Sequence, residues 1–296
     1  MDEPGLAALL QQFASQPRAE STPLAKQRTR LEKFAELFPS GTATPIDQVE
    51  LGGVSAERTR VGDGPVVLYL HGGGYAVGSP RSHRHLTERL ALDIRGTVFS
   101  LQYRLAPEAP YPAALDDATA AYKALLSRYG QIAAVAGDSA GGGLSFALLM
   151  VLRDCGLPSP QCVVGLSPWV NLKSTSVTFQ TLAARDLLVS SATADFFADL
   201  YAGTTRQDFP LVSPLQGNVA GLPPTHIQAG QNEVFLGDIC AFAQKLAAAG
   251  VPLELQVWEG MFHVWQLYWP KLKAGRDALH SAASFIARHA TLGDRN

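Results

Sequence analysis

The chain has 296 residues, of which 47% are hydrophobic and 17% charged, and its formal net charge is −2 at pH 7. These values are typical of a globular protein with a substantial core and exclude a disordered chain. They give no reason to expect a nucleic acid or an anionic membrane as a partner. No apolar run approaches the ~20 residues of a membrane span, so none is expected.

The N-terminus and the cysteines indicate the compartment. The acidic start Met1-Asp2-Glu3-Pro4 is not followed by a basic region with an apolar core, so we expect no signal peptide and a cytoplasmic protein. Cys155, Cys162 and Cys240 lack metal-ligand spacing and cannot all pair. We expect them to be small buried hydrophobes in a reducing compartment, and we expect no metal.

The periodicity of apolar residues predicts an α/β protein. Residues 1–40 show helical periodicity, and beyond them strands alternate with helices. The predicted strands are Asp47–Leu51, Ala56–Val61, Val66–Leu70, Thr97–Leu101, Ile132–Ala136, Cys162–Leu166, Thr225–Ala229 and Leu253–Trp258. The predicted helices are Ser82–Ile94, Ala113–Tyr129, Leu144–Leu152, Asp238–Ala249 and Ala274–His289. This alternation indicates a mostly parallel central sheet flanked by helices.

Residues 170–215 interrupt the alternation. They are rich in apolar residues but contain no convincing strand, which predicts a helical insertion. We expect this insertion and residues 1–40 to form a cap, and residues 41–169 and 216–296 to form the catalytic domain. Phe179, Phe196 and Phe197 of the insertion are consistent with a finite apolar pocket.

A sharp turn is predicted between strand Ile132–Ala136 and the helix that follows it. The turn reads Gly137-Asp138-Ser139-Ala140-Gly141-Gly142, and small residues around the serine let the strand and helix backbones nearly touch. This pattern is typical of a nucleophile elbow, in which a serine is held at strained backbone angles. The amide of Ala140, at the positive end of the helix, would face an oxyanion formed beside Ser139.

The segment His71-Gly72-Gly73-Gly74 follows strand Val66–Leu70, at the edge where parallel sheets bind ligands. Its glycines leave backbone amides accessible as oxyanion donors. A dinucleotide-binding loop is the rival interpretation. The G-x-G-x-x-G spacing is absent and no acid closes the next strand, so the oxyanion loop is favoured.

A serine nucleophile requires a base and an acid that orients it. Of seven histidines, His263 follows the last strand in an apolar loop and is the favoured base, whereas His71 is expected to hold the glycine loop. The other five are expected to be structural or at the surface: His83, His85, His226, His280 and His289.

The loop after strand Thr225–Ala229 offers two acids. Glu233 lies near the strand end and is favoured, while Asp238 is expected to cap the following helix and is the fallback acid. The order serine, acid, histidine is the one used by the α/β-hydrolase fold. Asp116, Asp117 and Asp138 are expected to be buried anchors or solvated helix residues.

From Val66 to Trp265 the chain resembles the hormone-sensitive-lipase-like esterase family of α/β-hydrolases. The matching motifs are His71-Gly72-Gly73-Gly74-Tyr75, Tyr103-Arg104-Leu105-Ala106-Pro107-Glu108 continuing to Pro112-Ala113-Ala114-Leu115-Asp116-Asp117, Gly137-Asp138-Ser139-Ala140-Gly141-Gly142, and Met261-Phe262-His263. The resemblance implies an α/β-hydrolase fold with a helical cap and hydrolysis of small-molecule esters with short to medium acyl chains. It implies no cofactor.

The resemblance also implies the roles of individual residues. Ser139 would be the nucleophile and His263 the base, with the amides of Gly73, Gly74 and Ala140 as the oxyanion hole. Many family members carry Asp-Pro-Leu-x-x-Asp where this chain reads Glu233-Val234-Phe235-Leu236-Gly237-Asp238. The match therefore puts Glu233, a longer side chain, in the position of the acid.

Several alternatives share these residues. A lactone or amide hydrolase or an acyltransferase would use the same site. The plant gibberellin receptors resemble the family without the histidine, but His263 is present here. The aromatic cluster Trp265, Leu267, Tyr268 and Trp269 is interpreted either as packing of the closing helix or as a homodimer contact, and a homodimer is expected.

Overall fold

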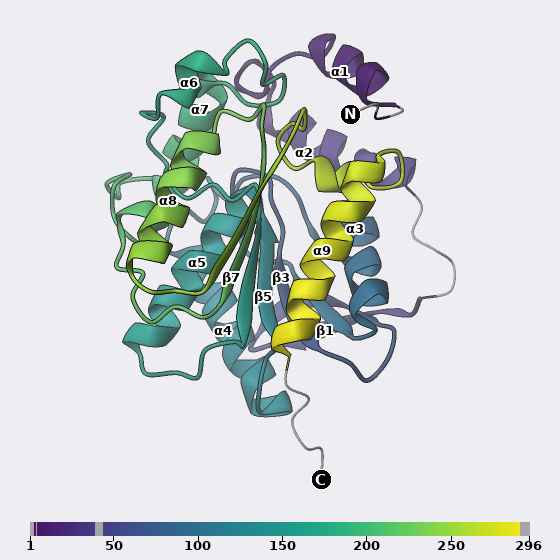
Figure 1. Cartoon of the computed structure of the whole chain (residues 1–296), viewed down its shortest axis with the longest axis vertical. Coiled ribbons are helices and arrows are strands. Elements are labelled where there is room, and N and C mark those ends of the chain that lie inside the picture. The colour runs from purple at the N-terminus through teal and green to yellow at the C-terminus, as the bar shows by residue number, and fades with distance from the viewer. Residues whose placement is uncertain (1–2, 4, 39–43, 291–296) are drawn as a thin grey trace.

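A computed structural model of the chain describes residues 3, 5–38 and 44–290 (Figure 1). Within these ranges the strands form one eight-stranded sheet in the order β1-β2-β4-β3-β5-β6-β7-β8. The strands are β1 Ile46–Leu51, β2 Val54–Arg60, β3 Val66–Leu70, β4 Thr97–Leu101, β5 Ala134–Asp138, β6 Cys162–Leu166, β7 Thr225–Gly230 and β8 Leu253–Trp258. The β1–β2 and β2–β4 pairs are antiparallel and all others are parallel, which confirms the predicted mostly parallel sheet.

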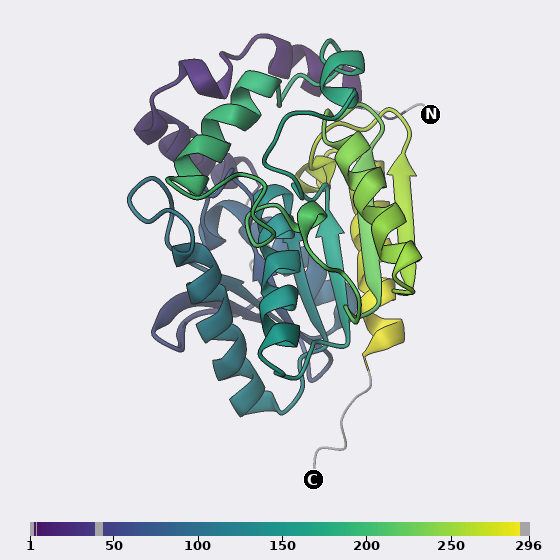
Figure 2. The ribbon, with the colours of Figure 1, turned by 90° about the vertical axis from the view of Figure 1, so that its left-hand side faces the viewer.

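Helices cover both faces of the sheet. Figure 1 shows α3 (Pro80–Ile94) and α9 (Lys273–His289) on one face, and Figure 2 shows α4 (Ala113–Tyr129), α5 (Ser139–Asp154) and α8 (Leu236–Ala248) on the other. Parallel strands joined by crossover helices produce this three-layer arrangement.

Strand β3 shows how the sequence builds both cores. Successive side chains of a strand point to opposite faces, so a strand buried on both faces is apolar throughout. Val67 and Tyr69 pack in the core beneath α3 and α9, while Leu68 and Leu70 pack in the core beneath α4 and α5. All four side chains are fully buried.

The remaining helices lie above the carboxyl ends of the parallel strands (Figures 1 and 2). They are α1 (Leu6–Ala14) and α2 (Leu24–Phe34) from the N-terminal segment, and α6 (Thr178–Thr181) and α7 (Ser191–Ala202) from residues 170–215. The Thr193 hydroxyl of α7 donates to Glu20 Oε2 at 2.5 Å, so these two segments, remote in sequence, contact each other.

Helices α3, α5, α8 and α9 all begin earlier than predicted, and the starts of α5 and α8 bear on the site. Helix α5 begins at Ser139 rather than Leu144, because its run of glycines belongs to the helix where it packs tightly against neighbouring backbone. Helix α8 begins at Leu236, so Asp238 lies in its first turn and the prediction that it caps the helix was wrong. The predicted break at Pro39-Ser40-Gly41 lies outside the described residues.

The prediction for the cysteines was only partly right. Cys162 in β6 is buried, but Cys155 and Cys240 are exposed because they lie on outward positions at the end of α5 and on α8.

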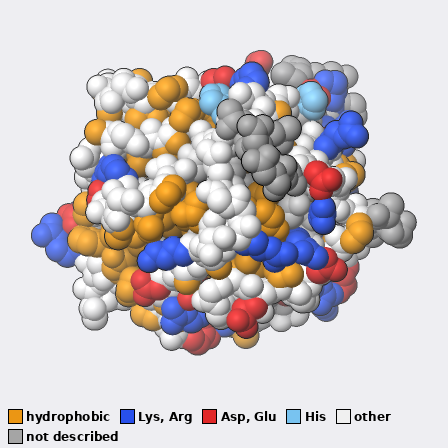
Figure 3. All heavy atoms as spheres, turned by 90° about the horizontal axis from the view of Figure 1, so that it is seen from below, with side chains coloured by type: hydrophobic (Ala, Val, Ile, Leu, Met, Phe, Trp, Pro, Cys, Tyr) orange, Lys and Arg blue, Asp and Glu red, His pale blue; other side chains and the backbone are white. Residues whose placement is uncertain are grey.

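None of the helices in the described ranges combines the length and apolar character needed to cross a bilayer. The face seen from below in Figure 3 carries Lys and Arg side chains beside Asp and Glu, rather than a surface of one sign.

Candidate active site

The turn between β5 and α5 holds Ser139 in a strained conformation. Its φ is 50°, and a non-glycine residue at positive φ costs about 1–3 kcal/mol. A Cβ on Gly137 would lie 2.4 Å from the Gly141 oxygen, and one on Gly141 would lie 2.0 Å from the Leu70 oxygen. The prediction that small residues must flank the serine is therefore confirmed by the packing.

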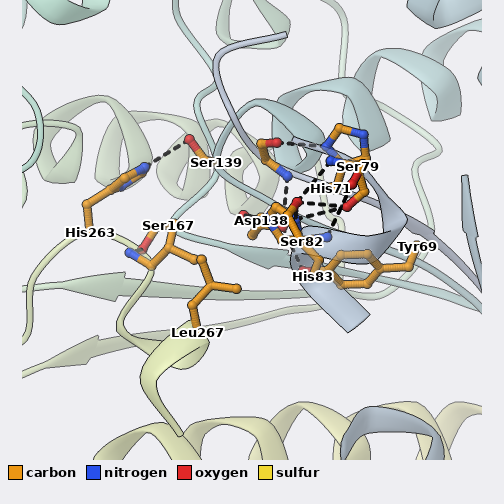
Figure 4. Close-up of polar contacts among 12 residues, drawn as sticks. Tyr69, His71, Ser79, Ser82, His83, Asp138, Ser139, Ser167, His263 and Leu267 are labelled. Carbon is orange, nitrogen blue, oxygen red and sulfur yellow. Dashed lines mark hydrogen bonds and ion pairs between the residues drawn. The ribbon is translucent and has the colours of Figure 1, made fainter. Parts of the chain in front are cut away.

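Ser139, His263 and Glu233 form one hydrogen-bonded series. Ser139 Oγ lies 2.9 Å from His263 Nε2 (Figure 4), and His263 Nδ1 lies 2.6 Å from Glu233 Oε2. The other carboxylate oxygen of Glu233 accepts the Gly230 amide at 2.6 Å. An ionised carboxylate only accepts hydrogen bonds, so it keeps the imidazole proton on Nδ1 and leaves Nε2 as the acceptor for the serine proton.

The environment makes the imidazole basic. Burial opposes protonation, but the hydrogen bond and the negative charge of Glu233 outweigh it, and the pKa of His263 is raised above 6.5. Burial also raises the pKa of Glu233, against the opposing effect of His263 and the Gly230 amide. Glu233 is fully buried and His263 nearly so.

Asp238, the fallback acid, is not part of this series. Its Oδ1 accepts a hydrogen bond from Asn171 Nδ2 at 3.2 Å, and burial raises its pKa to about 6. Its position in the first turn of α8 directs it to Asn171 of the insertion, while Glu233 contacts His263.

Gly73 and Gly74 adopt backbone angles that favour glycine, with φ of 115° and 58°. A Cβ on Gly74 would lie 2.4 Å from the Phe197 ring. Within the described part of the chain, no acceptor takes a hydrogen bond from either amide. The amide of Ala140 lies in the first turn of α5, where N–H groups lack intrahelical partners.

Asp138 anchors the glycine loop to the elbow. Its Oδ1 accepts the Gly72 amide at 2.9 Å and the Tyr69 hydroxyl at 2.7 Å, and its Oδ2 lies 3.3 Å from His83 Nε2 (Figure 4). The expectation of a buried anchor is thus confirmed for Asp138. The Asp138–His83 pair joins β5 to α3, and no local sequence signal indicates it.

His71 holds the loop as expected. Its Nδ1 donates to the Gly72 oxygen at 2.7 Å, and its ring stacks on Tyr103 with centroids 4.2 Å apart. Burial lowers the pKa of His71 to about 3, so the ring is neutral. Asp117, the other buried anchor, pairs with Arg104 at 2.7 Å, while Asp116 is exposed.

A cavity of about 740 Å³ opens beside Ser139 and His263. It is lined by Gly73 and Gly74 below and by residues of α1, α2 and the 170–215 segment above. Of the three phenylalanines expected at a pocket, Phe197 lines the cavity, whereas Phe179 packs against Phe235 and Phe196 against Phe197. The described residues contain no group of three or more His, Cys, Asp or Glu side chains that could hold a metal ion.

Residues 67–267, more than half of the chain, match a family model described as the α/β-hydrolase fold. The chain is 42% identical to an acetyl-hydrolase of Streptomyces hygroscopicus, covering 88% of each chain, and 30% identical to an esterase of Acinetobacter venetianus, covering 87% of each.

Solved structures of esterases resemble the fold of this chain. A hormone-sensitive lipase from a metagenome library is similar with a TM-score of 0.91 and 38% identity, covering 96% of this chain and 99% of that one. An esterase from the bacterial hormone-sensitive lipase family also has a TM-score of 0.91, at 36% identity and 96% coverage of each chain. The chain therefore belongs to the α/β-hydrolases, and within them to the hormone-sensitive-lipase-like carboxylesterases.

Proposed function

We propose that this carboxylesterase cleaves esters of short- to medium-chain acyl groups through an acyl-serine intermediate. Ser139 is the nucleophile, His263 the general base and acid, and Glu233 the residue that orients the imidazole. The amides of Gly73, Gly74 and Ala140 form the oxyanion hole. The observation that carries the proposal is the series Glu233–His263–Ser139, with separations of 2.6 and 2.9 Å, opening into the cavity.

The proposed steps balance in protons. His263 Nε2 takes the Ser139 proton as Oγ attacks the ester carbonyl. The oxyanion that forms accepts hydrogen bonds from the backbone amides of the oxyanion hole. His263 then protonates the departing alkoxide, leaving the acyl-serine. Water, deprotonated by His263, then attacks the acyl-serine. As this second tetrahedral intermediate collapses, His263 returns the proton to Ser139 Oγ, which releases the carboxylic acid and restores both side chains.

The cavity supports the proposed substrate class. Its volume of about 740 Å³ lies in the range of small-molecule sites. Bulky apolar side chains, among them Trp169, Phe197 and Phe235, share its lining with Ser139. This lining suits an acyl chain of limited length.

The test is hydrolysis of p-nitrophenyl esters from acetate to palmitate, with p-nitroacetanilide as the matched amide. We expect kcat/KM to peak at short to medium chains and to fall by about tenfold or more at palmitate, because a chain longer than the cavity leaves apolar surface in water. A maximum at palmitate would contradict the acyl-chain preference. Faster cleavage of the anilide than of the acetate ester would identify an amide hydrolase instead.

We also propose a homodimer, through a different surface from the aromatic cluster considered above. That cluster is packed within the chain, since Trp265 is fully buried and the Tyr268 ring lies 5.4 Å from Phe13. Strand β8 is instead an edge of the sheet, and its Leu255 and Val257 are 36% and 47% exposed. An apolar free edge is a template for pairing with a second copy about a twofold axis.

Light scattering should therefore give twice the mass of one chain. The variant Val257→Lys should shift the protein to a monomer, because it places a charge at the paired edge. Val177→Lys makes the same substitution at a 65% exposed valine away from β8 and should leave the dimer intact. A monomeric wild-type protein at micromolar concentration would reject the dimer.

A further inference from the structure

Side chains of one segment of the chain form hydrogen bonds with both backbone polar groups of Val234, the residue after Glu233. The Val234 amide donates to Asp186 Oδ2 at 2.9 Å, and the Val234 oxygen accepts from the Thr178 hydroxyl at 2.6 Å. Thr178 and Asp186 both belong to the insertion at residues 170–215. Both backbone polar groups of Val234 are therefore satisfied by side chains from outside the β7–α8 loop that carries Glu233.

The same carboxylate also shapes the wall of the cavity. Asp186 Oδ1 accepts the amides of Leu188 and Val189, at 3.0 and 2.8 Å. Leu188 and Val189 line the cavity beside Ser139. One buried side chain thus fixes the wall that meets substrate and the backbone that carries Glu233.

The hydrogen bonds indicate that Asp186 is ionised. Three N–H groups donate to its two oxygens, which suits an ionised carboxylate because it accepts at both oxygens and has no proton of its own to donate. Asp186 is fully buried and, within the described ranges, no Lys or Arg side chain forms an ion pair with its carboxylate. Burial raises its pKa, which the charge of His263 and the three amides oppose.

The charged and titratable groups around this pair come from several elements. Asp186 interacts electrostatically with His263 and Glu233, and the Arg18 guanidinium contacts its backbone oxygen at 3.3 Å. His263 interacts with Glu233, Asp186 and Asp138. Removing the charge of Asp186 therefore removes one of three negative charges that favour the imidazolium form of His263.

We propose that Asp186 is a positioning residue for the catalytic acid: with Thr178 it fixes the backbone at Val234, and its negative charge acts on the His263 imidazole. This inference rests on the proposed roles of Glu233 and His263. A loop anchor without a catalytic role would affect stability but not the pH dependence of turnover, which separates the two explanations.

The test compares Asp186→Asn, Thr178→Val and Asp195→Asn. The first removes a charge and leaves one acceptor oxygen for the amides of Leu188, Val189 and Val234. The second removes the hydroxyl that bonds the Val234 oxygen and the Gly237 amide, without a change of charge. The third removes an exposed carboxylate of α7 in the same insertion. Values of kcat and KM for p-nitrophenyl butyrate are measured from about pH 5 to 9.

Both bond-removing variants should lose about tenfold in kcat, because small displacements of catalytic groups are costly. KM should change little in Thr178→Val, whereas Asp186→Asn should also raise KM because it releases Leu188 and Val189 of the cavity wall. Only Asp186→Asn should move the acid limb of the kcat/KM–pH profile, by roughly half a pH unit toward lower pH, because losing a negative charge lowers the pKa of His263. Asp195→Asn should match the wild type in both measurements.

Two results would overturn the proposal. If folded Asp186→Asn protein keeps the acid limb of its kcat/KM–pH profile at the wild-type pH, the charge of Asp186 does not act on His263. If kcat of Thr178→Val stays within about twofold of wild type, the bond to Val234 does not position the catalytic acid. The Thr178→Val variant tests the positioning at Val234 even if the Asp186→Asn protein does not fold. Failure of the proposed function is distinct, since the wild-type enzyme would then show no serine-dependent turnover.

Discussion

Replacing Ser139 with alanine should lower kcat for p-nitrophenyl butyrate by about 10⁴-fold or more. The reason is that Oγ both attacks the carbonyl and carries the acyl group, so no neighbouring group can substitute for it. Residual turnover would come from the oxyanion hole and substrate binding alone, which leave about 10³–10⁴ over the reaction in water in serine hydrolases.

The matched control for Ser139→Ala is Ser145→Ala. Ser145 lies on the same helix, is fully buried, and donates its hydroxyl to the Gly141 oxygen at 2.8 Å, outside the cavity lining. Its loss should cost about 1 kcal/mol of stability and leave kcat within about threefold. A Ser139→Ala protein that retains a tenth of wild-type turnover would reject the acyl-serine mechanism.

The elbow and the glycine loop were predictable because their constraints are local. Contact between backbones demands small residues at Gly137 and Gly141, and the sequence contains them at the required spacing. The approach of Glu233 and His263 followed from a general rule, since the loops after neighbouring parallel strands lie at one edge of a sheet. Strands β7 and β8 are such neighbours.

The partners that hold the site were not predictable in the same way. The Asp138–His83 pair and the bonds of Asp186 and Thr178 to Val234 join residues far apart in sequence. Their geometry depends on how the insertion and α3 pack, which no periodicity encodes. The start of α5 at Ser139 was missed because glycines usually disfavour a helix, whereas here close packing against Leu70 and Trp169 requires them.

Glu233→Gln should lower kcat by about 10³–10⁴-fold, the second largest effect that the site predicts. A glutamine can donate from its amide to Nδ1, which favours the tautomer with a proton on Nε2 and removes the acceptor for the Ser139 proton.

The loss of charge in Glu233→Gln should also move the acid limb of the kcat/KM–pH profile. In the wild-type enzyme Glu233 raises the pKa of His263, so activity falls as pH drops through a value above 6.5. Without that charge burial dominates, and the limb should move to lower pH.

Asp238→Asn is the matched control, because it removes a second buried carboxylate five residues along the same loop and helix. We expect less than about a tenfold loss in kcat and an unchanged acid limb, since Asp238 contacts Asn171 and not the imidazole. The reverse pattern, with a severe loss in Asp238→Asn and a mild one in Glu233→Gln, would transfer the role of the acid to Asp238. It would also mean that the 2.6 Å contact between His263 and Glu233 does not persist during turnover. Comparison of the two pH profiles decides between the acids, because Glu233 bonds to the His263 ring and acts on its pKa, whereas Asp238 bonds to Asn171 instead.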